Sequence, residues 1–244
     1  MKVIHAVWEK RNIGIDVVEV EIEKDDLAEA VSERLDQIKA DYISVKLPSY
    51  LTEFLDVIQH KKFLYREDLI HVRHRLQPIT RTAVQQRMYD SVSYHEMSSR
   101  DICELKSEIE RGMFSSDRFS IDSRFTKKQC ANRYINWVDD LVLSGAKPFV
   151  MKYKEEHSGF IILKTEDKKT YQSILGGAYE KFRNSGLGIV QKEQEIVKKL
   201  GGTCVETTVS SNNVAQLKAL IQNGYIPYDV VHVFSRMDKR LENM

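Results

Sequence analysis

The sequence predicts an α/β protein made of two consecutive α/β blocks, and three observations support this prediction. Strand-like and helical segments alternate along most of the 244 residues, as expected for a sheet with helices packed on it. A polar, helical-looking stretch from about 78 to 111 joins the halves without a low-complexity linker. In the second half, a strand-like run leads into a turn with two glycines that opens a helix. We expect a smaller block over residues 1–95, a helical connector over 96–111 and a ligand-binding domain over 112–244.

The first block is expected to run strand, helix, strand, helix, strand. Apolar residues at helical spacing mark one helix, and Pro48 with Ser49 marks the start of the other. The strands are expected at 15–22, 42–47 and 64–76, and the helices at 26–39 and from Pro48 to about His60. The last strand alternates apolar residues with Arg73 and Arg75, so we expect this basic face to be solvated.

The second block is expected to open with a helix from Phe125 to Ser144. Tyr134 and Trp137 fall on its apolar stripe, which favours a core position over stacking against a ligand. The strands expected after it are 149–153, 159–164, 171–178, 204–209 and 230–237, with helices at 188–200 and from Val214. His157 lies in the charged segment between the first two of these strands, so we expect it in a solvated turn away from catalysis.

The segment that follows strand 171–178 predicts an anion-binding site. It contains Arg183, Asn184, Ser185, Gly186, Leu187 and Gly188. The two glycines let the backbone approach a ligand, and the first N–H groups of the helix face a negative group, usually a phosphate. A dinucleotide-binding fingerprint starting at Gly186 would place Glu206 correctly, but it has Gln191 in place of its third glycine. A helix start that binds no ligand remains the simpler alternative.

The second block has the order strand, R-x-x-G-x-G, helix, strand, N-x-x-A-x-L, Gly224-Tyr225, strand. This order resembles the acetyl-CoA-binding half of the GNAT superfamily of N-acetyltransferases. Asp117-Arg118-Phe119 and Asp122-Ser123-Arg124-Phe125 resemble the amino-sugar-nucleotide subgroup typified by TDP-fucosamine acetyltransferase, and Trp8-Glu9 with Gly14 is similar to its N-terminal motif. The resemblance implies a mixed central sheet with flanking helices, a reduced GNAT-like first block, acetyl-CoA as co-substrate and no metal.

The resemblance also implies where acetyl-CoA binds. The strand that ends at Ala178 and the strand 204–209 should be parallel neighbours that splay apart, with the thioester between them. A backbone N–H near Ala178 or Tyr179 would polarise the thioester carbonyl. The pyrophosphate would lie on the N–H groups of residues 183–188, and the Arg183 side chain would add positive charge. Asn213 would hydrogen-bond the pantetheine arm or, alternatively, cap the helix that follows it.

The catalytic residues are less well determined. The tyrosine that serves as the acid in this family would stand at position 220, which is Leu220 here. Either the thiolate leaves unassisted, which its pKa of about 8–9 permits, or Tyr225 or Tyr228 donates the proton. Glu206 on the strand and Glu180 at the mouth of the site are the candidate bases, and each is otherwise an ordinary solvated carboxylate.

The acceptor site is expected in the irregular stretch before the helix at 125–144. Asp117, Arg118, Asp122 and Arg124 could hold the hydroxyls or pyrophosphate of a sugar nucleotide, and a loop closed by its own salt bridges is the alternative. We expect an N-acetyltransferase that moves acetyl from acetyl-CoA to a primary amine by direct attack. The alternatives are an acetyltransferase for another small amine and a non-catalytic acyl-CoA-binding or scaffold protein.

Composition restricts the partners. Lys and Arg number 37 against 36 Asp and Glu, so no global field attracts nucleic acid or a membrane, although the basic strand face keeps an anionic partner as an alternative. The sequence lacks an apolar run of ~18 residues and a signal-peptide core, and we expect a cytoplasmic protein. Cys103, Cys130 and Cys204 lack metal-site spacing and are expected to be buried thiols. The first block is expected to scaffold, to shape the acceptor site or to form a homodimer.

Overall fold

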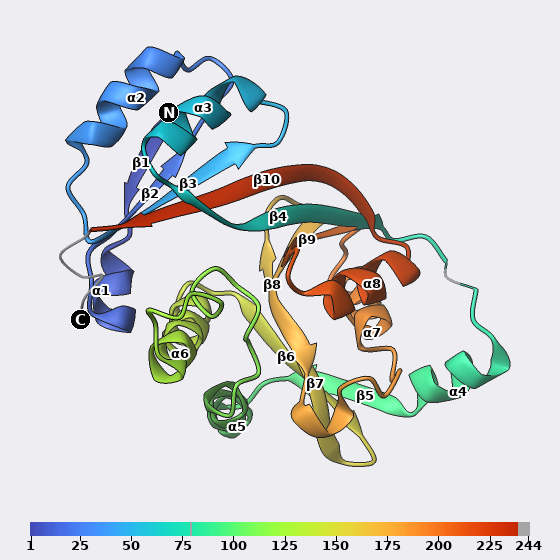
Figure 1. The fold of residues 1–244 in the computed structure, drawn as a ribbon. Coiled ribbons are helices and arrows are strands. Elements are labelled where there is room, and N and C mark those ends of the chain that lie inside the picture. Colours follow the sequence, from blue (N-terminus) through green and yellow to red (C-terminus); the bar gives the residue numbers. More distant parts are fainter. Residues whose placement is uncertain (79, 239–244) are drawn as a thin grey trace.

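The structure is a computed structural model that describes residues 1–78 and 80–238. Within these residues, ten strands form one mixed sheet in the order β1-β2-β3-β10-β4-β9-β8-β7-β6-β5 (Figure 1). The strands are β1 (Lys2–His5), β2 (Val17–Glu21), β3 (Tyr42–Pro48), β4 (Leu64–Arg75), β5 (Val92–Glu96), β6 (Lys147–Tyr153), β7 (Glu156–Thr165), β8 (Thr170–Ala178), β9 (Cys204–Ser210) and β10 (Ile226–Met237). The helices are α1 (Val7–Ile13), α2 (Ala28–Gln37), α3 (Leu55–His60), α4 (Ala83–Asp90), α5 (Ser99–Glu110), α6 (Lys127–Leu143), α7 (Ile189–Lys199) and α8 (Val214–Gln222), with 3-10 turns η1 (Thr52–Phe54) and η2 (Glu180–Phe182).

The two halves of the chain share strands. The last strand, β10, lies between β3 and β4 and is antiparallel to both, with Val231 opposite Pro48 on one side and Leu69 on the other. β4 in turn is antiparallel to β9, with Arg73 opposite Glu206. β5, at the predicted edge of the first block, pairs with β6. The predicted blocks therefore form one continuous sheet, and the position of a boundary between them stays a prediction.

Helices cover both faces of the second half of the sheet. Figure 1 shows α5 and α6 on one side of β6, β7 and β8, and α7 and α8 on the other side. The largest apolar core joins these layers through side chains such as Leu105, Val138, Ile161, Val197 and Leu220. A second core packs α2 and α3 against β2 and β3. The predicted fold class, an α/β protein with a mixed sheet and flanking helices, is confirmed.

The ends of the expected helices follow from capping chemistry. α6 begins directly after Thr126, whose hydroxyl accepts the Gln129 N–H at 3.2 Å while the Gln129 side chain accepts the Thr126 N–H at 2.9 Å. This reciprocal cap satisfies two N–H groups that have no partner inside the helix. Asn213 caps α8 in a similar way, because its Oδ1 accepts the Gln216 N–H at 3.2 Å. The capping role expected for Asn213 is confirmed, and its contact with pantetheine stays a prediction.

Some expectations from the sequence are wrong. The helix expected from Pro48 begins later, because Pro48 still belongs to β3 and α3 starts at Leu55. β1, α1 and β5 were not expected, since segments of four to seven residues are too short to display a period. Trp137 is 40 % exposed rather than a core residue. Of the three cysteines, Cys130 is buried, whereas Cys103 is exposed and Cys204 is partly exposed.

His157 is also placed differently from its expected position. The hairpin turn consists of Lys154 and Glu155, both with positive φ, and His157 already belongs to β7. Its side chain is 10 % exposed and lies between two carboxylates of α5, with Nε2 3.2 Å from Asp101 Oδ1 and Nδ1 3.0 Å from Glu104 Oε1. His157 is therefore buried because its side chain points from β7 to α5, and it does not lie in a solvated turn.

Candidate functional site

The predicted splay between two parallel strands is present. β8 and β9 pair only from Thr170–Ser173 with Cys204–Thr207. Beyond that point the ladder between them ends, while β8 continues to pair with β7 as far as Ala178. The register between β7 and β8 shifts at this place, because Ile162 faces Leu175 but Leu163 faces Ser173. This bulge bends β8 away from β9 and opens what we call the strand gap, bounded by residues 174–178 and 208–210.

The backbone of β8 directs one N–H of the predicted pair into the strand gap. The Tyr179 N–H donates to the Ser158 carbonyl at 3.1 Å, so Tyr179 faces β7 and is not available to a thioester. Because hydrogen-bonding direction alternates along an antiparallel strand, Gly177 also faces β7, and Gly176 and Ala178 face the gap. The Ala178 N–H is therefore the candidate oxyanion donor, and the assignment of Tyr179 to this role is wrong.

The anion-binding segment follows directly at the end of β8. Asn184, Gly186 and Gly188 have positive φ of 61°, 70° and 69°, and they alternate with residues of negative φ. Successive N–H groups in such a backbone point into one concave nest that binds anions. Within the described part of the chain, the N–H groups of Gly186, Leu187 and Gly188 donate to no acceptor. α7 begins at Ile189, so its positive end adds to the same site.

Two predicted catalytic residues meet on the sheet face at the closed end of the strand gap. The Tyr228 hydroxyl donates to Glu206 Oε2 at 3.1 Å, and Gln172 Nε2 donates to the same oxygen at 3.2 Å. Arg73 lies over the Tyr228 ring, with its guanidinium carbon 3.9 Å from the ring centre. Burial and then the negative Glu206 raise the pKa of the Tyr228 phenol, and Arg73 opposes them in part. A phenol of this kind keeps its proton and is able to donate it.

Solved structures with the same arrangement of elements were found by comparison. A fungal protein described as a GCN5-related glucosamine N-acetyltransferase region superposes with a TM-score of 0.63 at 13 % identity, over 91 % of this chain and 30 % of that one. A GCN5-related N-acetyltransferase from Sphaerobacter thermophilus gives 0.56 at 12 % identity, over 86 % and 64 %. One from Kribbella flavida gives 0.53 at 12 % identity, over 93 % and 84 %. No protein-family model and no curated protein matches the chain.

The chain has the GNAT fold. Identities this low establish the fold alone, so the activity is argued below from the site. Across residues 1–78 and 80–238, no helix has the length and apolarity needed to span a membrane, and no cluster of His, Cys, Asp or Glu could hold a metal ion. The cytoplasmic location and the homodimer stay predictions.

Tyr225, the third predicted catalytic residue, lies on the opposite face of the sheet in this GNAT fold. It is 2 % exposed, and its hydroxyl donates to Glu193 Oε2 of α7 at 2.9 Å. Leu220, which occupies the usual tyrosine position, is also fully buried in the apolar core. Glu180, the second candidate base, is exposed on η2 and pairs with Arg183 at 3.0 Å. Tyr228 is therefore the better-placed acid, and Glu206 the better-placed base, of the predicted residues.

Glu193 and its neighbour Glu195 have opposite electrostatic environments. Burial raises the pKa of Glu193. Hydrogen bonds from Ser173 and Tyr225 lower it, but they offset only part of the effect of burial. Burial would also raise the pKa of Glu195, but hydrogen bonds from Tyr89, Lys199 and Lys192 lower it to about 2. The folded protein therefore favours the protonated form of Glu193 and the ionised form of Glu195.

We expect Glu193→Gln and Glu195→Gln to change thermal stability with opposite signs. A raised folded-state pKa destabilises the protein as pH rises above the unfolded value, so Glu193→Gln should raise the melting temperature at pH 8 and lose this advantage near pH 4. A lowered pKa stabilises the protein above the unfolded value, so Glu195→Gln should lower the melting temperature at pH 8, less so near pH 4. Thermal unfolding of both variants from pH 4 to 8 tests this. Parallel curves for the two variants would contradict it.

A contact between α4 and the anion-binding segment was not expected from the sequence. The ring of Tyr89 lies 3.8 Å from the point where a Cβ on Gly188 would stand. Arg81 donates to the Gln191 side chain, and its guanidinium carbon lies 3.8 Å above the Tyr89 ring. Lys192 Nζ is 3.7 Å from the same ring centre. Tyr89 of α4 therefore lies beside the N–H nest, and its ring contacts one cation from the segment before α4, Arg81, and one from α7, Lys192. No local pattern in the sequence indicates this contact, because Tyr89 and Gly188 are about 100 residues apart.

Arg183 has a partner other than a phosphate. Its Nη2 donates to the Met113 carbonyl at 3.1 Å, and its Nε pairs with Glu180. The Arg183 side chain therefore ties the anion-binding segment to the loop after α5. Its predicted contribution of charge to a bound pyrophosphate stays a prediction.

The loop between α5 and α6 crosses the strand gap. On the β8 side, Met113 Sδ lies 3.9 Å from the position of a Cβ on Gly177. On the β9 side, the Ser210 hydroxyl donates to the Ser116 carbonyl at 3.1 Å. An acceptor that reaches the thioester from this face would therefore contact residues 113–118 of the loop.

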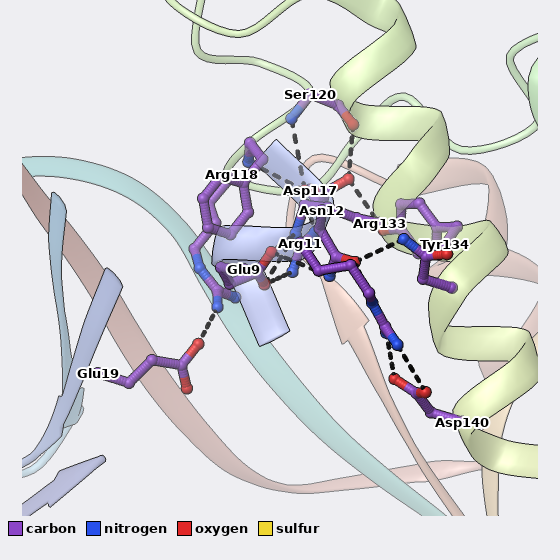
Figure 2. Close-up of polar contacts among 12 residues, drawn as sticks. Glu9, Arg11, Asn12, Glu19, Asp117, Arg118, Ser120, Arg133, Tyr134 and Asp140 are labelled. Carbon is purple, nitrogen blue, oxygen red and sulfur yellow. Dashed lines mark hydrogen bonds and ion pairs between the residues drawn. The ribbon is translucent and has the colours of Figure 1, made fainter. Parts of the chain in front are cut away.

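The four predicted acceptor-binding residues are brought together in this loop but bind the protein itself. Asp117 accepts from the Ser120 hydroxyl at 2.6 Å and the Tyr134 hydroxyl at 2.9 Å, and Arg118 Nη2 donates to Glu19 at 2.5 Å (Figure 2). Asp122 is held by both arms of Arg124 at 2.8 and 2.6 Å and by Arg66 at 3.3 Å. These contacts favour the alternative of a loop closed by salt bridges, and contact of the four residues with an acceptor stays a prediction.

Proposed function

We propose that the protein transfers an acetyl group from acetyl-CoA to a primary amine by direct attack in a ternary complex. The observation that carries the proposal is the order of two groups of hydrogen-bond donors along the chain, one at the end of β8 and one just after it. β8 first presents the Ala178 N–H to the strand gap. It then leads into the N–H groups of residues 186–188, which have no acceptor among residues 1–78 and 80–238. An extended thioester with a diphosphate at its far end matches this order, because the oxyanion donor and the phosphate donors lie at successive points of the same path.

The amine is proposed to belong to a nucleotide-linked amino sugar. The likeness of residues 117–125 to the amino-sugar-nucleotide subgroup supports this choice. The internal pairing of Asp117, Arg118 and Asp122 weighs against a direct grip on the sugar nucleotide by these residues. Another small primary amine is therefore the second candidate. A non-catalytic acyl-CoA-binding protein is the third, and the buried Leu220 at the usual acid position favours it.

Gly186→Glu tests the coenzyme site. We expect it to weaken binding of coenzyme A by about 10²-fold or more, since like charges about 4 Å apart repel by several kcal/mol near a protein surface. Isothermal calorimetry on the full chain measures the effect. Gly201→Glu is the matched control, because Gly201 has a similar positive φ of 85° at the other end of α7 with open space around it. Equal binding by wild type and Gly186→Glu, or equal loss in both variants, would exclude this site.

Turnover distinguishes an enzyme from a binding protein. Release of free thiol from acetyl-CoA is followed with UDP- and TDP-linked amino sugars, glucosamine and ethanolamine as acceptors. Acetylation of one of these amines supports the proposal. Tight binding of coenzyme A without thiol release from any of them would favour the acyl-CoA-binding protein instead.

A further inference from the structure

A buried charge cluster lies beneath the loop that crosses the strand gap. It joins α1, β2, β4, α6 and the loop through six residues: Glu9, Glu19, Glu67, Asp117, Arg118 and Arg133. Figure 2 shows most of these side chains and the way they converge from α1, β2, the loop and α6. Burial on this scale is costly for ions unless each has a partner.

The cluster holds more negative than positive charge. Four carboxylates face two guanidiniums. Lys46 adds a third cation, which lies 2.9 Å from Glu19 and also pairs with the partly exposed Glu21. Arg133 forms ion pairs with Glu9 and Asp117, and Arg118 forms an ion pair with Glu19. Glu67 therefore has no ion pair of its own among the described residues.

Glu67 is the exceptional carboxylate of this cluster. It is 1 % exposed, and its Oε1 accepts the backbone N–H of Arg118 at 3.1 Å. Its Oε2 is buried without a hydrogen-bond partner within the described part of the chain. Burial raises the pKa of Glu67 and Asp117 adds to this rise, while Ser210 and Arg118 oppose it. For Glu19, by contrast, the effect of burial is outweighed by Arg118 and Lys46, which lower its pKa to about 2.

Glu67 also lies next to the strand gap. It belongs to β4, the neighbour of β9, and its side chain is on the face of the sheet that the loop covers, since Arg118 of that loop donates to it. Ser210, at the end of β9 that borders the gap, approaches the Glu67 carboxyl and donates to Ser116 of the loop. Glu67 Oε2 is therefore buried beneath the loop and beside Ser210, which borders the strand gap.

We propose that Glu67 is a catalytic residue whose Oε2 binds the ammonium group of the acceptor and takes its proton. The proposal rests on the proposed acetyl transfer. The ammonium loses one proton to Glu67, and the neutral amine attacks the thioester carbonyl carbon, forming the N–C bond. The C–S bond then breaks with its electron pair on sulfur. The nitrogen loses its second proton, the sulfur gains one, and the products are the amide, the thiol of coenzyme A and one proton released to solvent.

The charge balance gives the acceptor class. A bound ammonium supplies the cation that Glu67 lacks, so the site favours an amine that is protonated in solution over a neutral hydroxyl. The groups that face Glu67 are Arg118 and Asp117 from the loop and Tyr134 from α6. Arg118 stays charged and Tyr134 stays protonated, because their pKa values lie far above neutrality. Asp117 stays ionised, since its pKa is lowered by Arg133 and several hydrogen bonds despite its burial. Glu67 is thus the carboxylate of this set whose pKa its surroundings raise, chiefly through burial.

Glu67→Gln tests the role. The amide keeps the bond from Arg118 and removes only the proton acceptor, so kcat/KM for the amines named above should fall about 10²-fold or more. The dissociation constant of coenzyme A should stay unchanged, and the acidic limb of the pH profile of kcat/KM should disappear. Asp68→Asn is the matched control, since Asp68 is the next residue of β4 and pairs with His232 at 2.6 Å. Glu67→Asp should lower kcat but keep the acidic limb, which shows that the fold survives a change at this position.

The outcomes separate this proposal from the proposed function. If coenzyme A fails to bind wild type, the acetyltransferase function itself is wrong, and the role of Glu67 with it. If wild type acetylates an amine and Glu67→Gln keeps the rate and the acidic limb, only the role of Glu67 is overturned. If coenzyme A binds but wild type releases no thiol with any of these amines, Glu67 has no amine to deprotonate and the role is overturned as well.

Discussion

Arg133→Met is expected to lower the free energy of unfolding by about 3–5 kcal/mol, because it leaves a buried carboxylate without its counter-ion. Glu9 is 1 % exposed, and Arg133 holds it in a forked pair with donor–acceptor distances of 2.8 and 2.9 Å. The pair joins α1 to α6, and the Arg133 guanidinium also lies 4.0 Å above the Phe119 ring. Urea denaturation followed by circular dichroism measures the loss.

A second ion pair between the same two helices provides the control. Arg11 and Asp140 are 2.6 Å apart, but their side chains are 50 % and 44 % exposed (Figure 2). Exposed pairs contribute about 0–1 kcal/mol, so Arg11→Met should change stability little. Combining Arg133→Met with Glu9→Leu should recover the part of the loss that comes from Glu9, because that charge is then no longer buried without a partner, while Asp117 still lacks its pair with Arg133. Equal effects of Arg133→Met and Arg11→Met would show that burial of Glu9 is not what makes the pair important.

The features that the sequence predicted well are local ones. The N–H nest depends on Gly186 and Gly188 and on the helix that starts after them, all within ten residues. The caps of α6 and α8 depend on Thr126 with Gln129 and on Asn213 with Gln216, each three residues apart. The splay of β8 from β9 was inferred from the resemblance to acetyltransferases, since spacing alone does not reveal a bulge.

The features that the sequence did not predict depend on contacts between distant residues. Nothing local in β10 indicates that it pairs with both β3 and β4, although Val231 faces Pro48 of β3 and Leu69 of β4, both far earlier in the chain. In the sequence, Glu67 looks like an ordinary exposed carboxylate of a strand. Its burial becomes visible only in the structure, where the backbone N–H of Arg118, 51 residues later, donates to it. The same holds for Asp117 and Arg118, whose residue types suit either a ligand or a salt bridge. Only the tertiary structure shows that Glu19 and Tyr134 already bind them.

Glu9 belongs to a sequence motif whose structural role became clear only in the structure. The sequence offered Trp8-Glu9 with Gly14 as a likeness to an N-terminal motif. In the structure, Gly14 ends α1 with a φ of 84°, and Glu9 is the carboxylate that anchors this helix to α6. Glu9 therefore joins α1 to α6, and Arg133, its partner on α6, also pairs with Asp117 of the loop at 3.6 Å.

Tyr228→Phe is expected to lower kcat by about 10²-fold or more, the usual contribution of a general acid. The Tyr228 hydroxyl is held by Glu206 at the closed end of the strand gap, and its raised pKa keeps the proton in place until a thiolate forms. Steady-state thiol release at saturating acetyl-CoA measures kcat, with the coenzyme affinity measured separately. A loss confined to kcat indicates that the phenol acts on the leaving group.

Two variants near Tyr228 in sequence serve as controls. Tyr225→Phe should reduce stability, because Glu193 loses the hydroxyl that donates to it at 2.9 Å, and should leave kcat close to that of wild type. Leu220→Ala should cost about 2–5 kcal/mol of stability through the cavity it leaves and should not change the chemical step in protein that remains folded. If Tyr228→Phe keeps full kcat, the thiolate leaves unassisted or takes its proton from water. If Tyr225→Phe instead loses kcat, the acid lies on the α7 face of the sheet and the assignment of Tyr228 is wrong.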